Sequence, residues 1–238
     1  MPKPAILAIM LTVAALPFWA EDMLPTDDEI AGKITETEMQ RLATLHDYTV
    51  IRKYELHNSH FKTDTIMTVR LKYQKGCGKS FEVIGVENAE GMCRRVLDKL
   101  LQSEAESSRK ESQDQFAISK INYKFHVIGT DTRDGRSCYV VDLIPKHKSR
   151  FLVQGKAWVD KNEFALVRIE ARPSVSLSFW VGKPYIVQDF QKVGSFWFAA
   201  HNRSESESWV LGSSVLTIDY SNYKVTPEIH VALNHTAP

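Results

Sequence analysis

The stretch from Tyr123 to Pro173 constrains the fold most, because it contains four consecutive strand-like segments joined by short turns. We expect strands at Tyr123–Ile128, Cys138–Ile144, Phe151–Val159 and Phe164–Ile169. Asp134-Gly135 between the first two apolar runs is typical of a hairpin turn, because these residues tolerate a positive φ. A sheet of this kind needs other segments to cover one of its faces, so the rest of the chain decides what fills that face.

The segment before this block predicts one helix and three strands. Apolar residues at approximately helical spacing indicate a helix from about Asp27 to His46, with Asp27 or Asp28 as its N-cap. The period then changes to that of strands, which we expect at Thr49–Leu56, Ile66–Tyr73 and Phe81–Val86. In the first of these strands the positions on one face are apolar, and Arg52 is the exception.

A second helix is predicted from Met92 to about Glu106. Its apolar residues follow one helix face, and they are Cys93, Val96, Leu97, Leu100 and Leu101. This stripe is expected to press onto the sheet and to cover its hollow. The polar stretch Gln102–Gln115 is either the solvated end of the helix or a mobile loop, and we favour the solvated end.

Further strands are expected after the block of four, at Val175–Val181, Tyr185–Phe190, Phe196–Arg203 and Val215–Tyr223. The chain therefore contains roughly ten strands and two helices. The strands come in consecutive runs and do not alternate with helices, which argues against a parallel sheet. The fold class that we predict is α+β, a large antiparallel sheet with helices on one face.

The N-terminus predicts export. Lys3 precedes an uncharged apolar run from Ala5 to Ala20, and Glu21-Asp22 follows at once, which is the pattern of a secretory signal peptide. We expect residues 1–20 to be a signal peptide and residues 21–238 to be a single domain. The alternative is a retained N-terminal anchor helix. No Cys follows the apolar run, so a lipid anchor is not expected.

Charge and cysteine content exclude some partners and leave one question open. The formal net charge is +1, and without Lys3 it is about zero, so nucleic acid is not an expected partner. The chain has three cysteines, which allows at most one internal disulfide. Cys77 could pair with Cys93 or with Cys138, and the sequence does not choose between them.

No catalytic or metal-binding constellation is found, and we expect no enzyme activity and no cofactor. Gly76–Ser80 ends like a phosphate-binding loop, but a strand follows it where a helix is required, so we interpret it as a hairpin turn. His57 and His60 lack a third ligand nearby. A hydrolase with a scattered triad is the least favoured hypothesis.

Three runs in the four-strand block resemble a known superfamily. They are Asp142-Leu143-Ile144-Pro145-Lys146, Gly155-Lys156-Ala157-Trp158-Val159-Asp160 and Phe164-Ala165-Leu166-Val167-Arg168. With the order of helices and strands, they resemble the periplasmic lipoprotein-carrier superfamily (LolA/LolB-like), which includes the outer-membrane lipoprotein-sorting proteins. The resemblance covers about Asp28 to Tyr223. It implies an unclosed antiparallel barrel whose concave hollow is covered by helices and takes acyl chains.

The expected function is that of a periplasmic carrier that binds lipid or lipoprotein acyl chains. The candidate ligand-binding residues are Met67, Leu71, Val83, Leu97, Leu101, Trp158, Phe179 and Trp180. Trp158 is expected to turn its ring toward the hollow or its rim. The expected partners are a lipid or an acylated protein, with an inner-membrane transporter or an outer-membrane acceptor beside them. The alternative is an envelope sensing or docking module that binds another protein.

Overall fold

The computed structural model describes residues 24–60, 63–88, 91–108, 115–149, 151–176, 183–208 and 212–227. Its elements, in chain order, are α1 (Asp27–Thr44), β1 (Leu45–Asn58), β2 (Thr65–Gln74), β3 (Gly78–Glu87), α2 (Gly91–Ser107), β4 (Tyr123–Arg133), β5 (Arg136–Pro145), β6 (Val153–Asp160), β7 (Leu166–Pro173), β8 (Tyr185–Val193), β9 (Phe196–Ser208) and β10 (Gly212–Pro227). The described residues therefore form ten strands and two long helices, as the sequence predicts.

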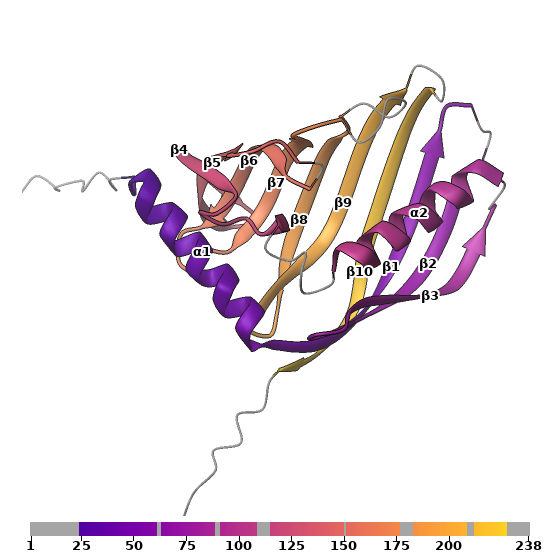
Figure 1. Cartoon of the computed structure of the whole chain (residues 1–238), viewed down its shortest axis with the longest axis horizontal. Coiled ribbons are helices and arrows are strands. Elements are labelled where there is room, and N and C mark those ends of the chain that lie inside the picture. Colours follow the sequence, from indigo (N-terminus) through magenta and orange to yellow (C-terminus); the bar gives the residue numbers. More distant parts are fainter. Residues whose placement is uncertain are drawn as a thin grey trace, which may run out of the picture.

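All ten strands belong to one antiparallel sheet, with the order β3-β2-β1-β10-β9-β8-β7-β6-β5-β4. The first strand thus pairs with the last inside the sheet, and β3 and β4 form the two edges. The sheet is curved and does not close (Figure 1). The segment from β3 to β4, which contains α2, must lead from one edge to the other.

Each helix packs on its own half of the sheet (Figure 1). Ile30, Ala31 and Ile34 of α1 belong to a buried cluster with residues of β4 to β7, among them Val141 and Val159. The α2 cluster joins Cys93, Leu97 and Leu101 to Tyr54, Leu56, Met67, Val69 and Ile218 of β1, β2 and β10. Two separate apolar contacts therefore hold the two helices over the sheet, and the predicted α+β half-barrel is confirmed.

The start of α1 differs from the prediction in its capping residue. Thr26 is the N-cap, and it forms a capping box in which Thr26 N donates to Glu29 Oε2 at 2.8 Å and Glu29 N donates to Thr26 Oγ1 at 3.3 Å. The Asp27 carboxylate instead accepts a hydrogen bond from Val127 N at 2.8 Å and pairs with His126 at 3.0 Å. Asp27 therefore ties the helix to β4.

The predicted turns and strands are largely confirmed, and most of the strands are longer than expected. Asp134 and Gly135 both have a positive φ, 49° and 75°, in the hairpin between β4 and β5. Residues 75–77 form the turn between β2 and β3, so the loop that resembles a phosphate site is a hairpin. Val175 and Ser176 are not in a strand, and the remainder of the predicted strand Val175–Val181 lies outside the described residues.

All three cysteines lie within the described residues, and the structure shows whether they form a disulfide. Cys77 is exposed, Cys93 and Cys138 are buried, and all three are free thiols. Neither of the disulfides that the sequence left open is formed.

Candidate ligand-binding hollow

A hollow lies between the two helices and the sheet, and two cavities make it up. The first, of about 520 Å³, is lined by α1, the turn before β7, and β8 and β9; we call it the α1 lobe. The second, of about 510 Å³, extends to β1, β2, β10 and the end of α2; we call it the α2 lobe. They share the lining residues Glu38, Arg41, Ile118, Leu166, Phe190 and Trp197. The two lobes are therefore adjoining parts of one space.

Aromatic side chains form the wall of the α2 lobe. The ring of Tyr48 stacks on that of Tyr73 with centroids 5.2 Å apart, and it lies 5.0 Å from the ring of Phe198. Phe198 in turn stacks on Tyr223 at 4.7 Å. Burial raises the pKa of the Tyr220 and Tyr223 hydroxyls well above the ordinary value, so both stay neutral. This wall offers a large apolar surface with a few hydroxyl groups at its margin.

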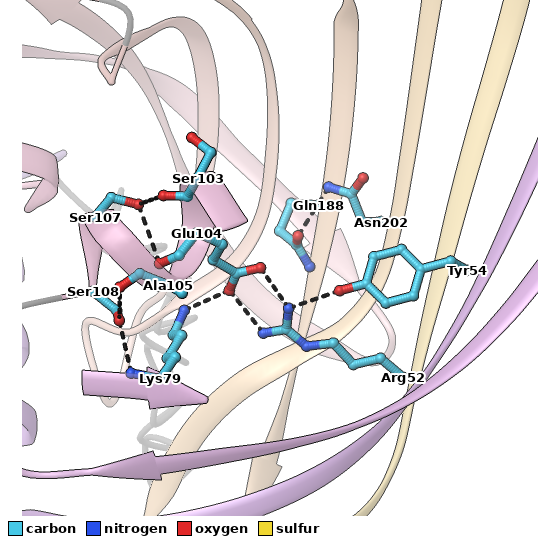
Figure 2. Close-up of polar contacts among 10 residues, drawn as sticks. All are labelled: Arg52, Tyr54, Lys79, Ser103, Glu104, Ala105, Ser107, Ser108, Gln188 and Asn202. Atoms are coloured by element: carbon cyan, nitrogen blue, oxygen red, sulfur yellow. Dashed lines mark hydrogen bonds and ion pairs between the residues drawn. The ribbon is translucent and has the colours of Figure 1, made fainter. Parts of the chain in front are cut away.

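The polar end of the α2 lobe is an ion-pair network of Arg52, Glu104 and Lys79 (Figure 2). The guanidinium of Arg52 donates from Nη1 to Glu104 Oε2 at 2.7 Å and from Nη2 to Glu104 Oε1 at 3.0 Å. Lys79 Nζ donates to Glu104 Oε1 at 2.7 Å. Nη1 of Arg52 also donates to the Tyr54 hydroxyl at 3.1 Å. One carboxylate therefore lies between two cations.

The helical period explains why Glu104 faces the sheet. It follows Leu97 by seven residues and Leu101 by three, so it continues the buried stripe of α2. One turn later Ser108 accepts a hydrogen bond from Lys79 N at 2.7 Å. The prediction that the polar residues after Leu101 stay solvated is wrong for Glu104 and Ser108, because β3 and Arg52 supply partners for their polar atoms.

The charges of the network stabilise one another. Burial works against both charged groups, but the attraction of Glu104 raises the pKa of Arg52 above its ordinary value. Burial also raises the pKa of Glu104, but the charges of Lys79 and Arg52 outweigh it and lower that pKa to about 2. Glu104 is therefore ionised at neutral pH, and the network carries two positive charges and one negative charge.

Further polar side chains border the α1 lobe. Arg41 and Glu38 of α1 form an ion pair at 2.6 Å. Glu163 accepts hydrogen bonds from Trp197 Nε1 at 2.9 Å and from Lys192 Nζ at 2.8 Å, and these two bonds lower its pKa. Each of these charges has a partner of opposite sign or a donor within the described residues.

The residues that the sequence predicts as ligand-binding lie outside the lining of the hollow wherever the structure describes them. None of the described ones lines either lobe. Met67, Leu97 and Leu101 are buried in the α2 cluster, and Leu71 is buried in a second cluster together with Tyr73 and Phe198. Val83 is 38% exposed on the edge strand β3. Phe179 and Trp180 lie outside the described residues.

Trp158 is turned away from α1. Its neighbours in β6, Ala157 and Val159, belong to the cluster with Ile30 and Ile34, and side chains alternate along a strand. Trp158 packs instead with Cys138 and Val167, is 5% exposed, and donates from Nε1 to Asp131 Oδ2 at 2.9 Å. The expectation that its ring faces the hollow or its rim does not fit this position, since Trp158 lines neither lobe.

The residues that line the hollow were not predicted from the sequence, although Arg52 was noted as unusual. Tyr48, Phe198 and Tyr223 come together only because β1 pairs with β10, a contact between segments more than 150 residues apart. Arg52 was the one signal in the sequence, as a charged residue at a position where the strand pattern calls for an apolar one. Burial of such a residue requires a partner, which the structure supplies in Glu104.

Two classes of feature are missing from the described part of the chain. No group of His, Cys, Asp or Glu residues there could hold a metal ion. Neither of its helices is long and apolar enough to cross a membrane.

An open antiparallel half-barrel with two helices over a hollow is the class of protein that this geometry defines. A family model described only as an uncharacterized protein matches residues 113–229. No curated protein matches the sequence.

Solved structures similar to this chain include three bacterial proteins. A LolA superfamily protein from Nitrosomonas europaea is 13% identical, with 87% of this chain and 96% of that chain covered and a TM-score of 0.47. A DUF1329 family protein from Desulfovibrio piger is 12% identical, with 88% and 95% covered and a TM-score of 0.47. A putative outer membrane lipoprotein-sorting protein domain from Vibrio parahaemolyticus is 14% identical, with 84% and 95% covered and a TM-score of 0.44. The likeness of this chain to each of these structures concerns the fold alone.

Proposed function

We propose that the protein is a carrier that binds the alkyl chain of a lipid, free or attached to a protein, in the hollow between α1 and α2. The observation that supports this most is the aromatic wall of Tyr48, Phe198 and Tyr223, which lines a cavity of about 510 Å³. Pockets for small organic ligands typically measure about 300–1,000 Å³ and have mainly apolar walls. The signal-like N-terminus and the superfamily resemblance favour the periplasm as the site of action and outer-membrane lipoprotein sorting as the process.

The energetics suit a carrier that must also release its ligand. Each buried CH₂ group contributes about 0.8 kcal/mol, so ten of them contribute about 8 kcal/mol. The loss of translational and rotational freedom costs several kcal/mol of this, which leaves affinities near the micromolar range.

A substitution that places a bulky side chain in the hollow tests the proposed carrier function. Ala199 lines the α2 lobe, whereas the next residue, Ala200, lines neither lobe. Binding of the neutral fluorescent probe N-phenyl-1-naphthylamine to the purified protein would be measured for Ala199→Phe and for the control Ala200→Phe. We expect the first substitution to weaken probe binding about tenfold or more, because the added ring occupies the ligand's space. Equal binding by both variants would place the ligand elsewhere, and no probe binding by the unsubstituted protein would contradict the carrier function.

A docking module is the second candidate function, and the edge strand β3 favours it. Val83, Ile84 and Val86 are exposed on this strand, whose outer backbone groups have no neighbouring strand in the sheet. Such an edge can pair with a strand of another protein. Under this function, Ile84→Lys would abolish capture of the partner protein and leave probe binding unchanged. Under the carrier function it would change neither stability nor probe uptake measurably.

A further inference from the structure

We propose that the lipid that this protein carries has an anionic head group, a carboxylate or a phosphate, and that Arg52 binds this group inside the hollow. This inference rests on the proposed function and adds the charge class of the ligand. The head group would lie beside the Arg52–Glu104–Lys79 network, and the alkyl chain would extend along the aromatic wall toward the α1 lobe.

The first argument is the donor count of Arg52. A guanidinium has five N–H donors. Three are used, two from Nη1 and one from Nη2, toward Tyr54 and Glu104. Nε is buried and has no hydrogen-bond partner among the described residues. The two remaining donors, Nε–H and one Nη2–H, lie on the same edge of the planar group, which is the edge that binds a carboxylate or phosphate through two parallel hydrogen bonds.

The second argument is the charge balance of the α2 lobe. Its charged lining residues are Glu38, Arg41, Arg52, Lys79 and Glu104, which sum to one excess positive charge. Glu38 and Arg41 pair with each other, so the excess belongs to the network at Arg52. An unbalanced charge that is largely removed from water is costly, and a ligand with one negative charge removes this cost.

The third argument is that the same lobe offers both halves of an amphiphile's binding site. The Arg52 guanidinium lies over the ring of Tyr220, with its carbon 4.9 Å from the ring centroid. The Tyr220 hydroxyl has no hydrogen-bond partner within the described part of the chain and is available as a donor. From there the lobe continues along Tyr223 and Phe198. A head group at Arg52 therefore places an alkyl chain directly against the aromatic wall.

Four ligands with the same twelve-carbon chain test the inference. They are dodecanoate, dodecyl phosphate, dodecanol and dodecyltrimethylammonium, used below their micellar concentrations to displace N-phenyl-1-naphthylamine at neutral pH. We expect the two anions to displace the probe at concentrations about tenfold lower than dodecanol, because hydrogen bonds to a charged group are the stronger kind. The cation should be weaker than dodecanol. The ratio between the two anions distinguishes a fatty acid from a phosphate-bearing lipid as the source of the head group.

Substitutions in the network provide charge changes of opposite sign. Arg52→Gln should abolish the preference for anions over dodecanol. Lys79→Gln should reduce it about threefold, and Glu104→Gln should increase it about threefold, since each changes the local charge by one unit near the head group. Arg70 of β2 and Glu82 of β3 form an exposed ion pair that lines neither lobe. Arg70→Gln and Glu82→Gln are therefore the matched controls, and both should leave the preference unchanged.

The outcomes separate this inference from the proposed function. Displacement of the probe by anions, dodecanol and the cation at equal concentrations would overturn the inference and leave the carrier function intact. Unchanged preferences in both Lys79→Gln and Glu104→Gln would also overturn it, even if Arg52→Gln fails to fold. Absence of probe binding would overturn the carrier function itself, and the inference with it.

Discussion

Arg52 is the residue whose surroundings depart most from the pattern of its strand. Val50 and Tyr54, two residues on either side, are buried and belong to apolar clusters. Arg52 is also buried, with 5% of its surface exposed, and it is held by Glu104 of α2 and stacked against Tyr220. The side chain therefore acts as a polar contact between β1 and α2 within an otherwise apolar wall.

Loss of this side chain should destabilise the protein. In Arg52→Gln, Glu104 keeps only Lys79 as a partner, and we expect a decrease in the free energy of unfolding of about 3 kcal/mol, as is typical when one member of a buried pair is removed. In Arg70→Gln, which breaks the exposed pair with Glu82, the decrease should be less than about 1 kcal/mol. Urea denaturation measures both, and equal decreases would contradict the account of a buried pair.

Glu104 should make stability depend on pH in the acidic range. Its pKa is about 2 in the folded protein, below the ordinary 4.5, so the folded state binds fewer protons than the unfolded state between these values. The stabilisation is complete above the ordinary pKa and is lost as the pH falls toward 2. The difference in unfolding free energy between the unsubstituted protein and Glu104→Gln should therefore shrink on acidification. The corresponding difference for Glu82→Gln should stay small, and a difference for Glu104→Gln that does not change with pH would contradict the prediction.

The surroundings of single residues could be predicted from the sequence only in part. The unusual position of Arg52 was visible, but its partner was not, because Glu104 sits in a run of polar residues that looks solvated. Trp158 illustrates the opposite error. A large aromatic residue in a family-like run suggested a cavity wall, yet the alternation of β6 turns it to the face away from α1. A strand's two faces can be told apart only when one knows which of them the helices cover.

At the scale of elements, α2 combines an apolar and a polar attachment to the sheet. Cys93, Leu97 and Leu101 pack into the α2 cluster, while Glu104 and Ser108 bond to Arg52 and Lys79. Val96, which the predicted stripe included, is 44% exposed and lies at its margin. The helix period gave the buried face nearly correctly, because five apolar positions at this spacing leave little choice of face.

Leu97 tests whether α2 is part of the core. It is fully buried and lines neither lobe. We expect Leu97→Ala to decrease the free energy of unfolding by about 2–5 kcal/mol, from the lost apolar contacts and the cavity left behind. Val96→Ala is the matched control and should cost less than about 1 kcal/mol, because its side chain is already half in solvent.

Probe binding by the Leu97→Ala variant provides a second test. Leu97→Ala should leave the affinity for N-phenyl-1-naphthylamine unchanged at temperatures where the variant is folded. A small stability loss together with altered probe binding would instead mean that Leu97 contacts the ligand, as the sequence had suggested.

The glycine of Gly155-x-x-Trp158, a run that carries the superfamily resemblance, is explained by the packing of two strands. A Cβ atom at Gly155 would overlap the carbonyl oxygen of Glu170 in β7, so only glycine allows these two strands to approach as they do. Gly155 thus serves the packing of β6 against β7, whereas Phe164, Ala165 and Leu166 of the third run line the α1 lobe. The residues of the hollow lie mainly elsewhere in the sequence.

At the scale of the whole molecule, the strand order creates the hollow. Because β1 pairs with β10, the edge strands are β3 and β4, and the segment between them has to cross the open side of the sheet. This crossing segment contributes Glu104, Phe116 and Ile118 to the lining of the α2 lobe. The element list could be predicted from local patterns, but the order could not, since pairing between the first and last strands leaves no local signal.

Photolabelling tests the central claim, that an alkyl chain occupies this hollow, most directly. A twelve-carbon fatty acid with a diazirine near its methyl end would be irradiated with the purified protein, and the labelled residues located by peptide mass spectrometry. We predict labels on residues that line the hollow, Phe190, Phe198 and Tyr223 among them, and their loss when dodecanoate is in excess. Labels confined to the α2 cluster around Met67 and Leu97, or to the face that carries Trp158, would contradict the account, as would labelling that dodecanoate does not suppress.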